Sequence, residues 1–149
     1  MYATTRRSAL LLGAGMSLAL FAADKGAATP ADADAEIAKF TGGKAAEHGK
    51  IAIDLPEIAE NGNTVPLSIK VDSPMNAADY VSDVIVVGDA NPNAAIVTFH
   101  LTPLSGRAEV ATRIRLGGTG NVTVAAKTST GKLYIERKAV KVTIGGCGG

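Results

Sequence analysis

Apolar and polar residues alternate along most of the chain beyond residue 50. The clearest stretch is 65–71, where Val65, Leu67, Ile69 and Val71 are separated by polar residues or proline. A period of two residues is typical of a strand that buries one face. The same alternation recurs in residues 95–101, 110–116 and 122–126, whereas residues 84–87 form the continuous apolar run of a strand buried on both faces. The pattern therefore predicts β-strands in this part of the chain.

Short turns rich in glycine, asparagine and proline separate the predicted strands. They occupy residues 60–63, 89–93, 117–120 and 129–131. Residues 51–54 and a terminal strand ending at Ile144 bring the total to about seven short strands, a number typical of a β-sandwich. We therefore expect an all-β, immunoglobulin-like sandwich.

The apolar positions of the terminal strand change parity along its length. Leu133 and Ile135 are odd-numbered, whereas Val140 and Val142 are even-numbered. If the strand buries a single face, one extra residue has to be absorbed between the two sets. We therefore predict a bulge or bend around residues 136–139.

Residues 33–40 follow a helical pattern instead. Ile37 and Phe40 are three positions apart among good helix formers, and Gly42 and Gly43 follow as a stop signal. A short N-terminal helix is expected here.

The first residues of the chain resemble an export signal. Arg6 and Arg7 directly precede an uncharged run over residues 9–23, which is the pattern of a twin-arginine leader. This run is shorter than the roughly 20 apolar residues needed to span a bilayer, so a membrane anchor is the weaker alternative. Small residues around Ala33 suggest cleavage there. The predicted organisation is a signal peptide over residues 1–33, a sandwich domain over 34–144 and a flexible arm over 145–149, in a periplasmic protein.

Charge excludes some classes of partner. Residues 34–149 hold 12 basic and 12 acidic residues, a balance that argues against a general nucleic-acid or membrane-surface protein. Basic residues predominate after residue 100, where eight stand against two acidic ones. Ordinary solvated strand faces would explain this. The alternative is a bias of the arm's end of the molecule towards anionic cargo or an acidic partner, carried by five basic residues. These are Arg107, Arg113, Arg115, Lys138 and Lys141.

Cys147 is the single cysteine of the chain and is flanked by Gly145, Gly146, Gly148 and Gly149. An intramolecular disulfide is therefore impossible, and a lone cysteine in an exported protein suggests a reactive thiol or an intermolecular disulfide. A metal site is not expected, because the two histidines, His48 and His100, are far apart in sequence and lack acidic neighbours at ligand spacing. No catalytic residue and no cofactor motif is predicted.

Three readings of this cysteine remain open from the residues alone. It can be a carrier thiol, a tail cysteine that is incidental or links two copies of an exported interaction module, or part of a thiol oxidoreductase. The last reading is disfavoured because the chain has no second, resolving cysteine.

Several segments together resemble the SoxY family, the sulfur-carrier subunits of the periplasmic Sox system for thiosulfate oxidation. They are the twin-arginine leader, residues 56–66, 71–75 and 99–103, and the terminal Gly-Gly-Cys-Gly-Gly at 145–149. The resemblance covers nearly the whole predicted mature chain. It implies a carrier without enzymatic activity or cofactor, with Cys147 as the covalent attachment point for sulfur and the neighbouring glycines as a flexible arm.

The resemblance also implies partners. These are a SoxZ-like subunit in a heterodimer, a c-type cytochrome complex that joins thiosulfate to Cys147, a manganese-dependent hydrolase that releases sulfate, and in some hosts a sulfur dehydrogenase. No nucleic acid and no membrane span of the mature protein is expected. An exposed cysteine has a pKa near 8.5, so only roughly 3% of the thiol is in the thiolate form at neutral pH. We therefore expect the partner's active site to activate the thiol.

Overall fold

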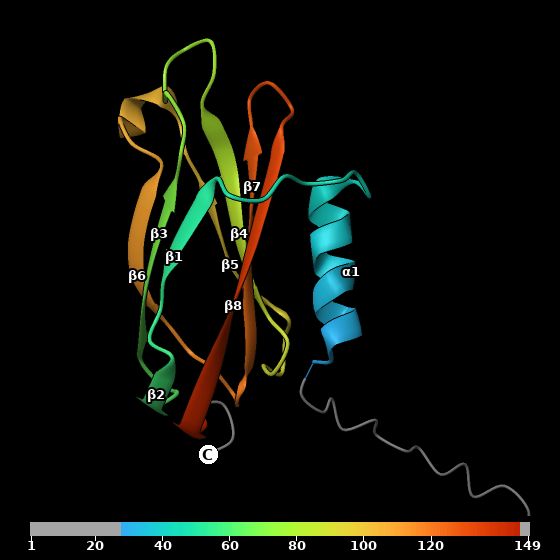
Figure 1. Cartoon of the computed structure of the whole chain (residues 1–149), viewed down its shortest axis with the longest axis vertical. Helices are drawn as coiled ribbons and strands as arrows, with labels where there is room; N and C mark the ends of the chain where they lie inside the picture. The colour runs from blue at the N-terminus through green and yellow to red at the C-terminus, as the bar shows by residue number, and fades with distance from the viewer. Residues whose placement is uncertain (1–27, 147–149) are drawn as a thin grey trace, which may run out of the picture.

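The computed structural model describes residues 28–146, which form two β-sheets with one helix packed on the outside (Figure 1). A three-stranded sheet and a five-stranded sheet face each other across the main hydrophobic core. The prediction of an all-β sandwich with a short N-terminal helix is confirmed. Within residues 28–146, no helix has the length and apolar character needed to cross a bilayer.

The three-stranded sheet contains β1 (Ile51–Asp54), β3 (Val65–Val71) and β6 (Glu109–Ile114), in the order β1-β3-β6. Both pairings are antiparallel. Strand β3 shows the alternation of the sequence directly, since its odd-numbered residues are buried and its even-numbered residues are exposed. Its four buried side chains supply one side of the core.

The five-stranded sheet has the order β2-β8-β7-β4-β5. Its strands are β2 (Ile58–Asn61), β4 (Val81–Gly88), β5 (Ala95–His100), β7 (Gly120–Thr128) and β8 (Leu133–Ile144). All its pairings are antiparallel except that between β2 and β8. The structure has one strand more than the sequence predicted, and the additional strand is β2. It is short, and its residues other than Ala59 are exposed, so it lacks a clear alternation.

The predicted bulge in the terminal strand is wrong. Strands β7 and β8 pair without a register shift from Lys127 opposite Leu133 to Gly120 opposite Val140. The change of parity has another cause, because both faces of β8 are covered. Ile135 packs under the helix, whereas Val140 lies in the core between the sheets.

Helix α1 (Pro30–Thr41) covers the outer face of the five-stranded sheet (Figure 1). Ala33, Ile37 and Phe40 pack against Ile85 and Val87 of β4, and Val84 and Val86 of that strand face the main core. The apolar run of β4 is thus buried on both faces, as predicted. The connection between β5 and β6 contains the 3-10 turn η1 (Pro103–Ser105).

The ends of α1 are capped by specific residues. The Thr29 hydroxyl accepts a hydrogen bond from the Asp32 amide, and the Asp32 carboxylate accepts one from the Thr29 amide, which is a capping box. Gly42 ends the helix in the left-handed conformation, at φ 64°. The helix therefore begins at Pro30 and continues through position 33, where the sequence suggests leader cleavage.

Candidate functional site

The structure describes only some of the residues that the sequence predicts to be functional. Arg6, Arg7, Cys147 and the two terminal glycines, Gly148 and Gly149, lie outside the described residues. Gly145 and Gly146 lie inside them, directly after β8. The candidate site is therefore described by the part of the sandwich from which Cys147 follows, which we call the arm end.

Three backbone hydrogen bonds hold the chain at the arm end. The Gly62 amide donates to the Ile144 carbonyl at 2.7 Å, and the Gly62 carbonyl accepts from the Leu116 amide at 2.8 Å. The Leu116 carbonyl in turn accepts from the Gly146 amide at 2.9 Å. The turn after β2, the segment after β6 and the chain after β8 thus meet at one place.

Thr119 fixes the last part of β8 from the other side. Its hydroxyl accepts from the Val142 amide at 2.9 Å and lies 3.2 Å from the Val142 carbonyl, to which it donates. The Thr119 hydroxyl therefore continues the pairing of β8 past Gly120, the first residue of β7. The end of β8 is held on both of its edges.

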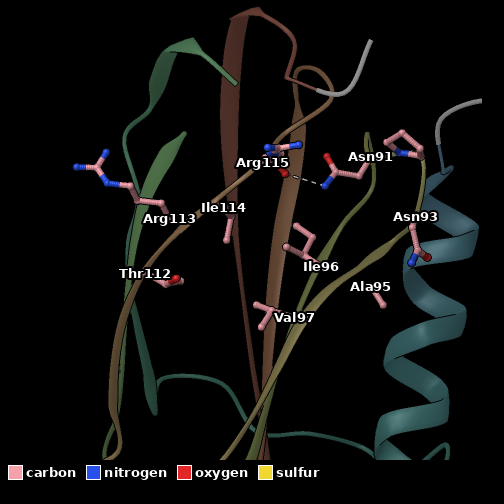
Figure 2. A pocket seen from close by; sticks show the side chains of 10 residues that line it. Asn91, Asn93, Ala95, Ile96, Val97, Thr112, Arg113, Ile114 and Arg115 are labelled. Atoms are coloured by element: carbon pink, nitrogen blue, oxygen red, sulfur yellow. Dashed lines mark hydrogen bonds between the residues drawn. The ribbon is translucent and has the colours of Figure 1, made fainter. Parts of the chain in front are cut away.

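Asn91 supports the segment after β6. Its side-chain amide donates to the Arg115 carbonyl at 2.8 Å (Figure 2). Its side-chain oxygen accepts from the Gly117 amide at 2.7 Å. The residue is only 7% exposed. A buried amide with both its polar atoms paired gives the loop it holds a defined position. Leu116 lies between the two bonded residues. Its carbonyl, which accepts the hydrogen bond from Gly146, is therefore fixed in position.

A groove opens between β5 and β6, the edge strands of the two sheets (Figure 2). Its volume is about 460 Å³. Ile96, Val97 and Ile114 line it with apolar surface, and Arg113 and Arg115 contribute basic residues at its rim. The two sheets therefore present unpaired strand edges on this side.

The structure separates the five basic residues that the sequence grouped. Arg113 lies 3.4 Å from the Thr64 hydroxyl, in the turn that follows Gly62, and Arg115 precedes Leu116. Lys141 pairs with Ile58, near the end of β8. Arg107 is close to η1, at the opposite end of β6, and its nearest acid is Glu109 at 4.0 Å. Lys138 lies in the middle of β8, opposite Val122. Of the five basic residues, Arg113, Arg115 and Lys141 thus lie near the arm end, and Arg107 lies away from it.

Both histidines are exposed, and each lies close to an acid that is distant in the sequence. His100 Nδ1 lies 2.6 Å from Asp83 Oδ1, and His48 Nδ1 lies 3.6 Å from Glu136 Oε1. Burial tends to raise the pKa of Asp83, but hydrogen bonds from Ser82 and His100 outweigh it and hold that pKa below its usual value. The His100 pair lies where β4 begins and β5 ends, far from the arm end. Among residues 28–146, no group of three or more metal-ligating side chains occurs.

Sequence reasoning missed three residues of the arm end. Gly62, Asn91 and Thr119 lie in segments that were predicted only as turns. The sequence offers one signal, the concentration of glycine and asparagine in three separate turns. It does not indicate that those turns meet, because each contact joins residues far apart in the chain.

Comparison with known proteins gives one family and one fold relationship. Residues 37–147 match the family model of the sulfur oxidation protein SoxY. The sulfur carrier protein SoxY from Chlorobium limicola f thiosulfatophilum is 31% identical, with a TM-score of 0.63 over 76% of this chain and 98% of that chain. No curated protein sequence matches.

A superoxide reductase (neelaredoxin) from Ignicoccus hospitalis also resembles the structure. It is 18% identical, with a TM-score of 0.56 over 77% of this chain and 94% of that chain. At this identity the likeness concerns the fold alone.

Proposed function

The chain belongs to the SoxY family of sulfur oxidation proteins, and we propose that it carries thiosulfate-derived sulfur on the thiol of Cys147. One observation supports this attachment site above all others. The single cysteine of the chain directly follows Gly146, and Gly146 is hydrogen-bonded to the body of the sandwich. The proposed attachment site therefore follows directly on a backbone position that the folded domain holds.

The proposed chemistry needs an electron acceptor for loading. The Cys147 thiol loses its proton and forms a sulfur–sulfur bond to the outer sulfur of thiosulfate, and two electrons pass to a c-type cytochrome complex. The product is a cysteine S-thiosulfonate. Water then attacks the sulfonate sulfur in a manganese-dependent hydrolase, the sulfonate leaves as sulfate, and a persulfide stays on Cys147. A sulfur dehydrogenase, where the host has one, oxidises the outer sulfur of the persulfide to a sulfonate with oxygen from water and passes the electrons to its own electron acceptor. A second hydrolysis then releases this sulfonate as sulfate and regenerates the Cys147 thiol.

Three basic residues near the arm end have the charge opposite to that of this cargo. A thiosulfonate ends in an anionic sulfonate, and Arg113, Arg115 and Lys141 lie on the elements that meet at the arm end. Attraction between such groups is long-range but screened by salt, so it favours encounter with an anion more than tight binding. We assign activation of the thiol to the partner enzymes.

Export and partnership complete the proposal. We infer that Arg6 and Arg7 direct the chain to the periplasm by the twin-arginine route, and that a SoxZ-like subunit forms a heterodimer with it. The unpaired edges of β5 and β6 beside the 460 Å³ groove leave room for a second subunit. Fractionation of cells that express an Arg6→Lys, Arg7→Lys variant tests export, because loss of the arginine pair should leave the precursor in the cytoplasm.

The attachment site is tested by the mass of the C-terminal peptide from the exported protein after incubation with thiosulfate and the cytochrome complex. We expect added mass that corresponds to thiosulfate, its removal by reductant, and its absence in Cys147→Ser. The folded stability of Cys147→Ser should equal that of the wild type. A reducible doubling of the protein's mass without any sulfur adduct would instead identify a disulfide-linked interaction module and overturn the carrier proposal.

A further inference from the structure

The backbones of Gly62 and Gly146 approach each other more closely than residues with side chains allow. A Cβ built on Gly62 would overlap the Leu116 carbonyl oxygen and lie 2.8 Å from the Gly146 amide nitrogen. A Cβ built on Gly146 would overlap the Gly62 carbonyl group. Neither glycine has a positive φ, so it is the closeness of the approach that requires glycine here. The requirement is reciprocal, because each residue occupies the space that the other's Cβ would need.

The contact is part of a closed set of hydrogen bonds. Gly62 uses its amide on Ile144 and its carbonyl on Leu116, and Leu116 uses its carbonyl on Gly146. We call Gly62, Leu116 and Gly146 the glycine clasp. Gly145 extends it, since a Cβ there would overlap the Gly117 carbonyl oxygen. Close backbone contact therefore continues for two residues beyond the last residue of β8.

The backbone of Leu116, to which Gly146 is hydrogen-bonded, is itself held in place. Asn91 bonds both neighbours of Leu116, and the Asn91 side chain is buried. A Cβ on Gly146 would meet the Gly62 carbonyl and the Asn63 amide rather than Leu116, so its substitution should push the chain after β8 away from the turn at Gly62 while Asn91 holds Leu116 in place. The hydrogen bond to Leu116 therefore ties the chain after β8 to a backbone segment that is itself fixed.

We propose that Gly62 is a positioning residue for Cys147: by closing the clasp with Gly146, it fixes the point at which the cysteine-bearing end of the chain leaves the sandwich. The inference rests on the proposed function of Cys147. Gly146 is one peptide bond from Cys147, so the Cα atoms of the two residues are about 3.8 Å apart. A partner enzyme then meets the thiol at a defined place beside the arm end. When the clasp is open, only a fraction of the carriers presents the thiol there, and the apparent affinity for the enzyme falls by that fraction.

The test is Gly62→Ala in the full-length exported chain, compared with Gly118→Ala. Gly118 is a matched control, because its φ is not positive and a Cβ there would only touch the Ala90 Cβ at 3.9 Å. We expect Gly62→Ala to raise the hydrogen-exchange rate of the Gly146 amide about tenfold or more, since that amide loses its partner. The KM of the carrier for the enzyme that loads it should rise about threefold or more with kcat unchanged. Gly118→Ala should match the wild type in both measurements.

Two further variants separate the clasp from other roles of the glycines. Gly146→Ala should raise exchange of the residue 146 amide and the KM in the same way, and the double variant should be no worse than the poorer single variant, because both changes open one contact. If glycine at 146 served only to enter a narrow cleft of the enzyme, Gly62→Ala would leave the KM unchanged. That result, or native exchange at residue 146 in Gly62→Ala, overturns the proposal.

The test still decides if Gly62→Ala does not fold or if the wild-type chain takes up no sulfur. If Gly62→Ala is unfolded at the assay temperature, exchange of the residue 146 amide in Gly146→Ala decides, and a rate equal to that of wild type contradicts the clasp. If Cys147 takes up no sulfur from thiosulfate in the wild-type protein, the proposed function fails. In that case the exchange measurements still report on the clasp, so the two failures are distinct.

Discussion

If the chain is exported as proposed, the position at which its leader is cleaved tests whether the first turn of helix α1 belongs to the folded domain. The sequence suggests leader cleavage near Ala33, but the structure places Ala33 inside α1, where it is only 4% exposed and packs against the five-stranded sheet. A chain that begins at residue 34 lacks Thr29, Pro30 and the first turn of the helix. We predict that the exported chain begins at or before Thr29, and that removal of residues 28–33 destabilises the domain.

The size of the effect follows from the contacts removed. Loss of an N-cap such as Thr29 destabilises a helix by about 0.5–2 kcal/mol. The remaining segment, 34–41, is far below the length of roughly 12–15 residues at which an isolated helix becomes marginally stable, so its order depends on packing. Truncation also removes the buried Ala33 side chain from that packing. We expect a total loss of about 1–3 kcal/mol, which lowers the Tm by about 4 °C or more in a domain of this size.

The measurements are the intact mass of the exported protein and thermal unfolding of chains that start at residue 28 and at residue 34. Thr29→Ala should reproduce part of the loss, and Thr29→Ser should not, because serine keeps the capping hydroxyl. An exported chain that starts at residue 34 and has the same Tm as the longer chain would refute the reasoning.

Three other predictions follow from the core, from the loop after β6 and from the cap of α1. Leu67→Ala should lower the free energy of unfolding by about 2–5 kcal/mol, since Leu67 is 1% exposed, whereas Leu104→Ala should change it by less than about 0.5 kcal/mol, since Leu104 is 97% exposed; urea unfolding measures both. Asn91→Ala leaves the part-buried Arg115 carbonyl and Gly117 amide without their partner and should cost about 1 kcal/mol or more by the same assay; an unchanged urea midpoint would contradict it. Hydrogen bonds from the Thr29 amide and hydroxyl hold the pKa of Asp32 below its usual 3.8, so its stabilising effect is present above that value and is lost as the pH falls through the folded pKa; wild type and Asp32→Asn should differ in urea midpoint near neutral pH and converge in strong acid.

The sequence predicted those elements whose pattern is local. Strand β3 alternates because one of its faces is buried and the other is exposed, and residues 84–87 of β4 are all apolar because a sheet covers one face of that strand and α1 the other. The terminal strand shows the limit of this reasoning. Its change of parity has two explanations, a bulge or burial on both faces, and the choice depends on a helix more than 90 residues earlier in the chain.

The candidate site was only half predictable for the same reason. Cys147 and its glycines are conspicuous in the sequence, since each is recognised from its immediate neighbours. Gly62 and Asn91 are ordinary turn residues when considered locally, and their importance comes from contacts with Gly146 and with both neighbours of Leu116. Strand β2 was missed because its main partner is the distant end of β8, in a parallel pairing that no short connection suggests.

If Cys147 carries sulfur as proposed, the clasp limits how far its thiol can reach from the sandwich. With Gly145 and Gly146 held against the sandwich, a single peptide bond separates Cys147 from a fixed backbone, and an enzyme has to contact the arm end itself to reach the thiol. With the clasp open, the two freed residues add about 7 Å of extended chain. A closed clasp therefore makes the surface around Arg115 and Lys141 part of what each enzyme recognises, whereas an open clasp would allow loading with little contact between the two proteins. Rates of loading that depend on these basic residues and fall with added salt would indicate that the closed form is the one the enzymes use.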